Sequence, residues 1–179
     1  PSLTQVPFGA AFSVTVTALD ANEQTVTDYA GTVRFGSSDA SATLPPDSAL
    51  NNGAGTFATT LRTVGAQSIT ATDTVAPTIT GAVSIDVIRA AQTITFAQPS
   101  AQTWGARPTL SASVSSGLTI MFTASGACTV ASSTATTVTL NLTDVGDCTV
   151  AAAQPGNTQY LAAPSVSRAF AVNKAEQTI

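Results

Sequence analysis

The sequence of 179 residues contains no histidine, and only 9% of its residues are charged. Without histidine the chain has no Ser-His-Asp or Cys-His catalytic group, no imidazole metal ligand and no ordinary general base near neutral pH. The glycine-rich motifs that bind nucleotide phosphates and the GxSxG motif of hydrolases are also missing from it. We therefore expect no enzymatic activity, no catalytic residues and no cofactor.

Positive charge is scarce and scattered. Six Lys and Arg residues stand against ten Asp and Glu residues, which gives a formal net charge of −4. Nucleic acids and anionic membranes bind clustered cations, so we expect neither as a partner. No apolar run approaches the roughly 18–20 residues that a membrane-spanning helix needs, so we expect no membrane insertion.

Small and β-branched residues are abundant instead: Thr, Ala and Ser supply 81 of the 179 residues. In many short segments apolar residues alternate with Thr or Ser, which is the pattern of half-buried strands. These segments are 12–18, 31–37, 54–61, 67–73, 81–88, 93–96, 110–114, 118–122, 128–130, 137–143, 148–152 and 165–172. No segment has a convincing helical period. The sequence predicts an all-β chain.

Turn signals separate these strands every 8–12 residues or so, which favours β-sandwiches or barrels. RAAQTI at 89–94 recurs as KAEQTI at 174–179, at the spacing of one Ig-like sandwich with its linker. We predict two tandem Ig-like β-sandwich domains, residues 1–89 and 90–173, followed by the start of a further repeat at 174–179. Projecting the same spacing backwards from Gln92 gives no match, so the first domain is predicted to be a different repeat type.

The predicted junction between the domains is short. The last strand of the first domain ends near Ile88, and the next begins at Gln92, with no Gly and no Pro between them. A link of this kind favours an elongated, semi-rigid arrangement over beads on a flexible string.

Longer stretches of the sequence carry a family resemblance. Residues 8–74, which include FSVTVTALDANEQTVTDYAGTVRFGSSD, resemble the bacterial Ig-like repeats of large surface proteins and adhesins. Residues 90–179, which include SSGLTIMFTASGACTV and DVGDCTVAAAQPGNTQYLAAPSV, resemble a second bacterial Ig-like repeat type that occurs in long arrays. The resemblance implies an extracellular or cell-surface location, with neighbouring Ig-like repeats of the same chain as partners. We expect a monomer.

The two cysteines, Cys128 and Cys148, both lie in the second domain, and each is followed by Thr and Val. Cys128 therefore shares a strand face with Val130, and Cys148 shares one with Val150. If both valines point into the core, both sulfurs do so too. A disulfide is the preferred interpretation and indicates an oxidising compartment. Two buried, reduced thiols are the alternative, whereas a zinc site would need four N or S ligands.

Carboxylates give only weak site signals. Asp20 begins a DANEQ turn that lacks the Gly and the distant Glu of an EF-hand loop. We expect no metal site, and Asp73, Asp86 and Asp144 are weak calcium candidates because calcium can bind between tandem β-domains. Paired turn carboxylates are more often solvated turn formers than glycosidase acids, since nothing in the sequence indicates a cleft between them.

Trp104 is the only tryptophan and the one candidate ligand contact. It stands in a Trp-Gly pair where the second repeat type commonly has Tyr before Gly. Tryptophan is enriched at binding hot spots because it combines a large apolar face with a hydrogen-bond donor. The favoured interpretation is nevertheless a cap at one end of the sandwich, below Pro108 and near Tyr160.

Three functional hypotheses follow. The preferred one is a structural spacer that projects a functional region of a large repetitive surface or secreted protein away from the cell. The second is an adhesive module that binds a glycan or a host surface protein through Trp104 or through sandwich-end loops such as 44–55. The third places the chain beside a secreted carbohydrate-active enzyme as accessory Ig-like domains.

Overall fold

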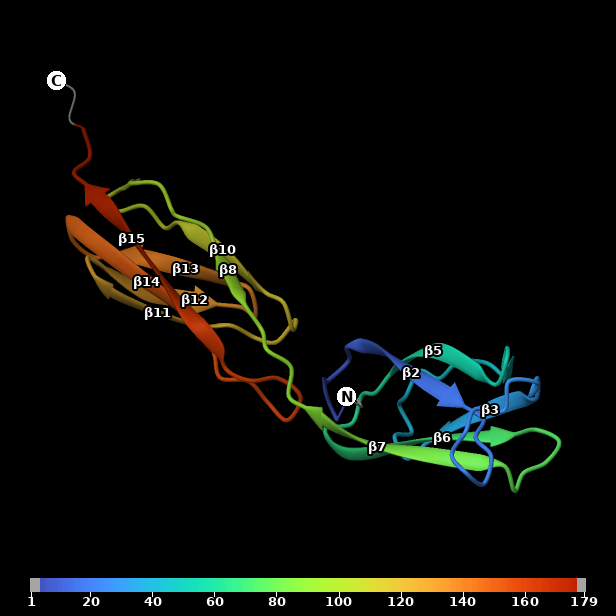
Figure 1. Ribbon diagram of the computed structural model, residues 1–179. Coiled ribbons are helices and arrows are strands. Elements are labelled where there is room, and N and C mark those ends of the chain that lie inside the picture. Colours follow the sequence, from blue (N-terminus) through green and yellow to red (C-terminus); the bar gives the residue numbers. More distant parts are fainter. Residues whose placement is uncertain (1–3, 177–179) are drawn as a thin grey trace. The chain divides into compact units, whose positions relative to one another are not determined.

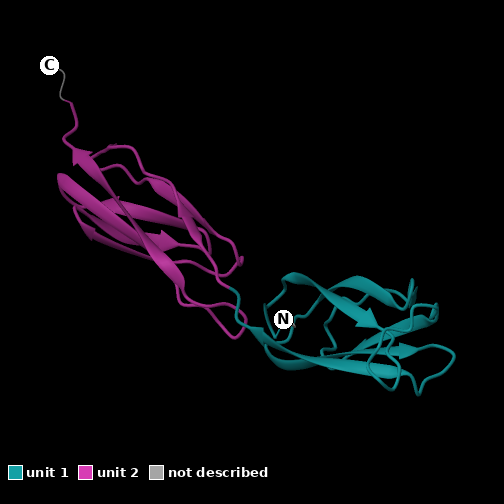
Figure 2. Cartoon of the chain, viewed as in Figure 1, with its two compact units in different colours: residues 1–90 teal, residues 91–179 magenta. Residues whose placement is uncertain are grey.

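The computed structural model describes residues 4–176, which fall into two compact units, residues 1–90 (unit 1) and 91–179 (unit 2) (Figure 2). All regular elements of residues 4–176 are β-strands, so the predicted all-β class is confirmed. Within this part of the chain there is no helix of the length and apolar character needed to cross a membrane.

Unit 1 has two sheets of unequal size (Figure 1). The larger has the strand order β1-β7-β6-β3-β4, and the smaller consists of β2 and β5 alone. The strands are β1 (Gln5–Pro7), β2 (Ala11–Thr17), β3 (Thr32–Ser37), β4 (Ser48–Ala49), β5 (Ala54–Thr60), β6 (Gly65–Asp73) and β7 (Thr80–Ile88). All pairs are antiparallel except β1 with β7, which run parallel.

Unit 2 has two four-stranded sheets, β12-β13-β10-β8 and β11-β14-β15-β9. The strands are β8 (Ile94–Phe96), β9 (Gln102–Thr103), β10 (Thr109–Val114), β11 (Met121–Gly126), β12 (Cys128–Ser133), β13 (Thr137–Leu142), β14 (Gly146–Gln154) and β15 (Ala163–Asn173). As in unit 1, a short early strand runs parallel to the last one: β9 pairs with the end of β15.

The topology of unit 2 is that of an Ig-like sandwich. In the usual strand lettering, β8, β10, β13 and β12 take the places of A, B, E and D, and β11, β14 and β15 those of C, F and G. In unit 1, β2 and β5 take the places of B and E, and β3, β6 and β7 those of C, F and G. Among the described residues of unit 1, no strand takes the place of A or D in the smaller sheet.

The core reflects the predicted alternation. Val33 and Phe35 are buried on β3, and on β2 the side chains of Phe12, Val14 and Val16 turn inward while their neighbours are exposed. One predicted core residue is not buried: Val130 is 37% exposed. Val130 pairs directly with the buried Leu140 and so shares its sheet face, but β12 is the outer strand of its sheet, which leaves this side chain at an open edge.

Candidate functional site

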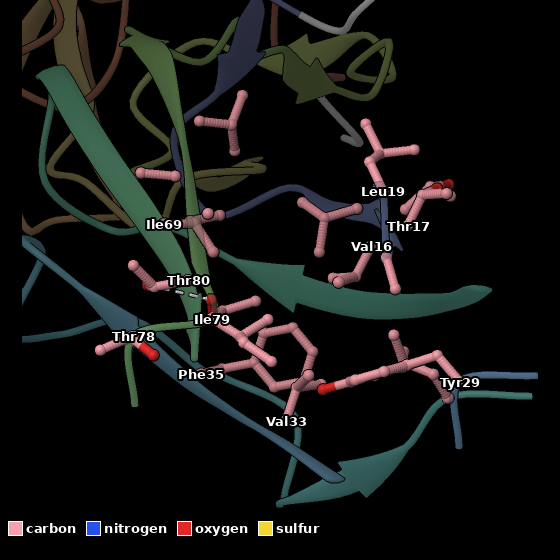
Figure 3. Close-up of a pocket in the computed structure, with 18 residues that line it drawn as sticks. Val16, Thr17, Leu19, Tyr29, Val33, Phe35, Ile69, Thr78, Ile79 and Thr80 are labelled. Carbon is pink, nitrogen blue, oxygen red and sulfur yellow. Dashed lines mark hydrogen bonds between the residues drawn. The ribbon is translucent and has the colours of Figure 1, made fainter. Parts of the chain in front are cut away.

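A groove of about 580 Å³ opens between the two sheets of unit 1. One wall is the second half of β2 with the residues after it, and the opposite wall is formed by residues 78–83 at the start of β7. Figure 3 shows Val16 and Leu19 on one side, Ile79 and Thr80 on the other, and Phe35 at the bottom. Most lining side chains are apolar, so the groove suits an apolar occupant.

The rim of this groove carries exposed apolar residues. Leu19 is 55% exposed and Ile79 50% exposed, although both are large aliphatic side chains. Nearby Val75 is 90% exposed but does not line the groove. Exposed apolar side chains on both rims of an apolar groove are typical of a binding surface.

One end of the groove is fixed by a polar contact. The hydroxyl of Tyr29, a lining residue, donates to the buried carboxylate of Asp73. Asp73 also accepts from the backbone amides of Val75 and Ala76, each at 2.7 Å. The Tyr29 hydroxyl and these two amides lower the pKa of Asp73, while the bond to Asp73 raises the pKa of Tyr29. The Asp73 carboxylate therefore holds the turn between β6 and β7 against Tyr29, which lies just before β3 in the chain.

A second buried carboxylate ties together loops of unit 1. Asp39 accepts from the backbone amides of Ser41, Arg62 and Thr63 and from the Thr63 hydroxyl at 2.7 Å. Burial alone would raise the pKa of Asp39, but the Thr63 hydroxyl and the amides outweigh it, so this pKa lies below its usual value. Nothing in the sequence marks Asp39 as buried, because an Asp in a turn carries no signal of burial.

In unit 2 the structure links Cys128 and Cys148 by a disulfide, with 5.3 Å between their Cα atoms. Cys128 begins β12 and Cys148 lies on β14, so the bond joins the two sheets. Both residues are buried, at 1% and 0% exposure. The bond therefore forms part of the core.

The Gln-Thr-Ile sequence occurs at 92–94 and again at 177–179, and its first copy begins with a buried glutamine. Gln92 is 3% exposed, and its Nε2 donates to Gln154 Oε1 at 2.8 Å and to the carbonyl of Leu161 at 2.6 Å. Its Oε1 accepts from the hydroxyl of Ser116. One side chain thus ties the entry of unit 2 to the end of β14 and to two separate loops. The recurrence of Gln-Thr-Ile is the sequence signal for this role, although the alternating pattern predicts Gln92 only as the start of a strand.

The three weak calcium candidates are not brought together. Asp73 accepts hydrogen bonds from Tyr29 and from the amides of the β6–β7 turn. Asp86 accepts from Gln5 Nε2 at 3.2 Å, and Asp144 accepts from the amide of Val145. Within residues 4–176, no group of three or more His, Cys, Asp or Glu side chains is placed to hold a metal ion. Calcium binding through these residues stays a prediction without geometric support.

Trp104 is 55% exposed, and its backbone amide donates to the carbonyl of Asn173 at 2.8 Å. It therefore lies beside the end of β15, whereas Tyr160 precedes the start of that strand. A strand of 11 residues extends about 35 Å, so the predicted cap of Trp104 near Tyr160 is wrong. The indole is instead half open to solvent, beside a turn in which Gly105 has a φ of +86°.

The candidate binding loop 44–55 of unit 1 is well held. It contains β4, and Arg34 on β3 forms an ion pair with Asp47 at 2.7 Å. Both partners are largely exposed, so the pair orders the loop more than it stabilises the fold. The loop backbone is also bonded to the residues before β3, because the amides of Leu50 and Gly53 donate to the carbonyls of Gly31 and Tyr29, each at 3.0 Å.

Comparisons with known proteins give structural matches only. No family model and no curated protein matches the sequence. Domains 4 and 5 of the S-layer protein SbsC align with a TM-score of 0.41 and 15% identity, over 88% of this chain and 79% of theirs. The D0-D1 domain of intimin aligns at 0.38 and 19%, over 93% and 95%. The Yersinia pseudotuberculosis adhesin InvE aligns at 0.43 and 19%, over 95% of this chain and 56% of its own.

Likeness at this level assigns no family, activity or partner to the chain. The Ig-like assignment stands on the strand order of the two units themselves.

Proposed function

We propose that the chain is a structural spacer, a stretch of a large repetitive bacterial surface or secreted protein in which tandem Ig-like sandwiches hold a functional region away from the cell. The junction is the observation that carries the proposal. Strand β7 ends at Ile88, and the side chain of Gln92 is already fixed inside unit 2. Only residues 89–91 remain as a link, which is too short to act as a flexible linker.

Three further features support an array of two repeat types outside the cytoplasm. The units differ in how many strands each sheet holds, five and two in unit 1 and four and four in unit 2. The Gln-Thr-Ile phrase that anchors unit 2 returns at 177–179, outside the described residues. A buried disulfide suits an oxidising, extracellular location.

Small-angle X-ray scattering tests the spacer. Six Gly and Ser residues inserted after Ala90 should change the distribution of interatomic distances and broaden its long-distance end, because the link then becomes a flexible coil. The same insertion after Ser100, in an exposed loop within unit 2, is the matched control and should leave the curve nearly unchanged. A wild-type chain that already scatters like the Ala90 insertion would contradict the proposal.

An adhesive role is the second candidate, and the exposed indole of Trp104 favours it. The ligand class would be a glycan or a host surface protein, bound at the end of unit 2 where β9 meets β15. The test is a binding screen of the chain on a glycan array and on whole cells, with Trp104→Ala in parallel. Binding that disappears in the variant supports adhesion through Trp104, and silence from both folded proteins rejects it.

The spacer requires no reaction by this chain, and the lack of histidine suits such a role. Accessory domains beside a secreted carbohydrate-active enzyme would have the same mechanical task, with catalysis placed elsewhere in the parent. In either setting the chain works as a monomer whose partners are its neighbouring repeats. Light scattering coupled to gel filtration would reveal a dimer if this were wrong.

A further inference from the structure

Two strand edges face each other across the groove of unit 1. Among the described residues, β2 pairs only with β5, so its other edge has no partner strand. Strand β7 pairs with β6 along most of its length, but β1 covers its second edge only at Asp86–Ile88. The groove lies between the second half of β2 and the uncovered part of β7. Unpaired edges beside an apolar groove are a template for strand addition.

Unit 2 shows what fills the same place in a complete sandwich. There β8 pairs antiparallel with the second half of β10, the counterpart of β2, through residues 112–114. The β8 side chains Ile94 and Phe96 point between the sheets and are only 9% and 3% exposed. The ring of Phe96 lies 6.1 Å from that of Phe122 on the opposite sheet. Two apolar side chains, two residues apart, close the core of unit 2 on this side.

We propose that the groove of unit 1 accepts an extended strand that pairs with the free edge of β2 and inserts alternate apolar side chains between the two sheets, and that this strand is the polypeptide leading into β1. The chemistry of the occupant follows from the lining, since Phe35, Ile69 and Val83 offer no charge and the two rims are aliphatic. Backbone hydrogen bonds to β2 would give such a strand its register, and the apolar side chains its affinity.

The source of the strand follows from the connection in unit 2. Five residues, 97–101, join β8 to β9, and β9 pairs with β15 in the way that β1 pairs with β7. The carbonyl of Thr4 accepts from the amide of Asp86, so the chain entering β1 runs beside β7 next to the groove. A strand joined to Gln5 through five residues, as β8 is joined to β9, would therefore reach the free edge of β2.

The test adds this strand to the whole chain. A copy of residues 91–97, AQTITFA, placed directly before Pro1 leaves five residues between its Phe and Gln5, as in unit 2. The readout is hydrogen exchange by NMR at the amides of Ser13, Thr15 and Thr17. These amides face the free edge, because Ala18 donates to Gly53 on the β5 side and alternate residues of a strand face opposite neighbours.

We expect exchange at these three amides to slow at least about tenfold with the added strand, because a tethered strand has an effective concentration in the millimolar range. An extension whose Ile and Phe are both replaced by Asp should give no protection. Amides of unit 2 serve as the internal reference for correct folding. Unchanged exchange at β2, or equal protection by the Asp extension, overturns the proposal.

Two rim variants sharpen the test. Leu19→Lys with Ile79→Lys should cancel the protection, because both side chains are exposed at the groove and can be changed without emptying the core. Val75→Lys, outside the lining, is the matched control and should preserve it. Protection that grows with protein concentration would show that the strand enters from a second copy, which contradicts an intrachain source.

Discussion

Unit 1 and unit 2 have closely related strand orders, yet they build their cores differently. In unit 2 the fully buried apolar residues come from both sheets, with Val138 and Leu140 on one and Val150 and Val172 on the other. In unit 1 no fully buried apolar residue lies on β2 or β5, whose apolar side chains are only partly buried. The difference coincides with the strand β8, which closes one side of unit 2 and has no counterpart among the described residues of unit 1.

A single edge strand therefore contributes to how completely a sandwich excludes water. Strand β8 has three residues, but it covers the second half of β10 and adds two apolar side chains to the core. Unit 1 has the buried carboxylates of Asp39 and Asp73, which join its loops by hydrogen bonds. Unit 2 adds a disulfide between its sheets. The two units should therefore respond to different perturbations.

The largest expected effect is on unit 2 and follows loss of the disulfide. Replacing both Cys128 and Cys148 by Ala should lower the free energy of unfolding of unit 2 by about 3 kcal/mol, because the unfolded chain gains the entropy of a loop of some 20 residues. Scanning calorimetry should show one transition shifted and the transition of unit 1 unmoved. A shift of both transitions would mean that the units do not unfold independently.

Matched core truncations test the comparison directly. Val138→Ala on β13 should cost about 2 kcal/mol, because the site is fully buried and cannot collapse around the missing methyl groups. Val14→Ala on β2 should cost about 1 kcal/mol, because that side chain faces the open groove. Urea denaturation of the two variants provides the measurement. Equal losses would contradict the claim that unit 1 is packed less completely.

Acid should weaken unit 1 through its buried carboxylates. The pKa values of Asp39 and Asp73 lie below their usual 3.8, so the charged forms are favoured by the fold. Their contribution is complete above the pKa of the unfolded chain and is lost as the pH falls through the lower folded values. The melting temperature of unit 1 should therefore decline below about pH 4. Asp39→Asn should flatten this decline, and an unchanged pH profile in that variant would count against the assignment.

The smallest effect on stability is expected at Trp104. Because the indole is half exposed, Trp104→Ala should change the stability of unit 2 by less than about 0.5 kcal/mol. A larger loss in thermal melting would show that the side chain packs as part of the fold. The near-neutral result would make the variant a clean probe of binding.

The period-two pattern predicted most strands and their inward faces, because each such strand has one side on the core. It could not predict β1, β4 or β9, because these strands of two or three residues lack the apolar-polar-apolar order that marks β8. The exposure of Val130 depends on the position of β12 at the edge of its sheet, which the alternation within one strand does not reveal. The groove could not be predicted at all, because it depends on which edges find partners and not on any residue taken alone.

The parallel pairing of β1 with β7 has a mechanical consequence. Tension on the chain pulls β1 backwards from Gln5 and β7 forwards from Ile88, in opposite directions along their common axis. The hydrogen bonds between the two strands are then loaded together in shear and cannot be opened one at a time. A strand of only three residues can therefore set the force at which unit 1 begins to yield.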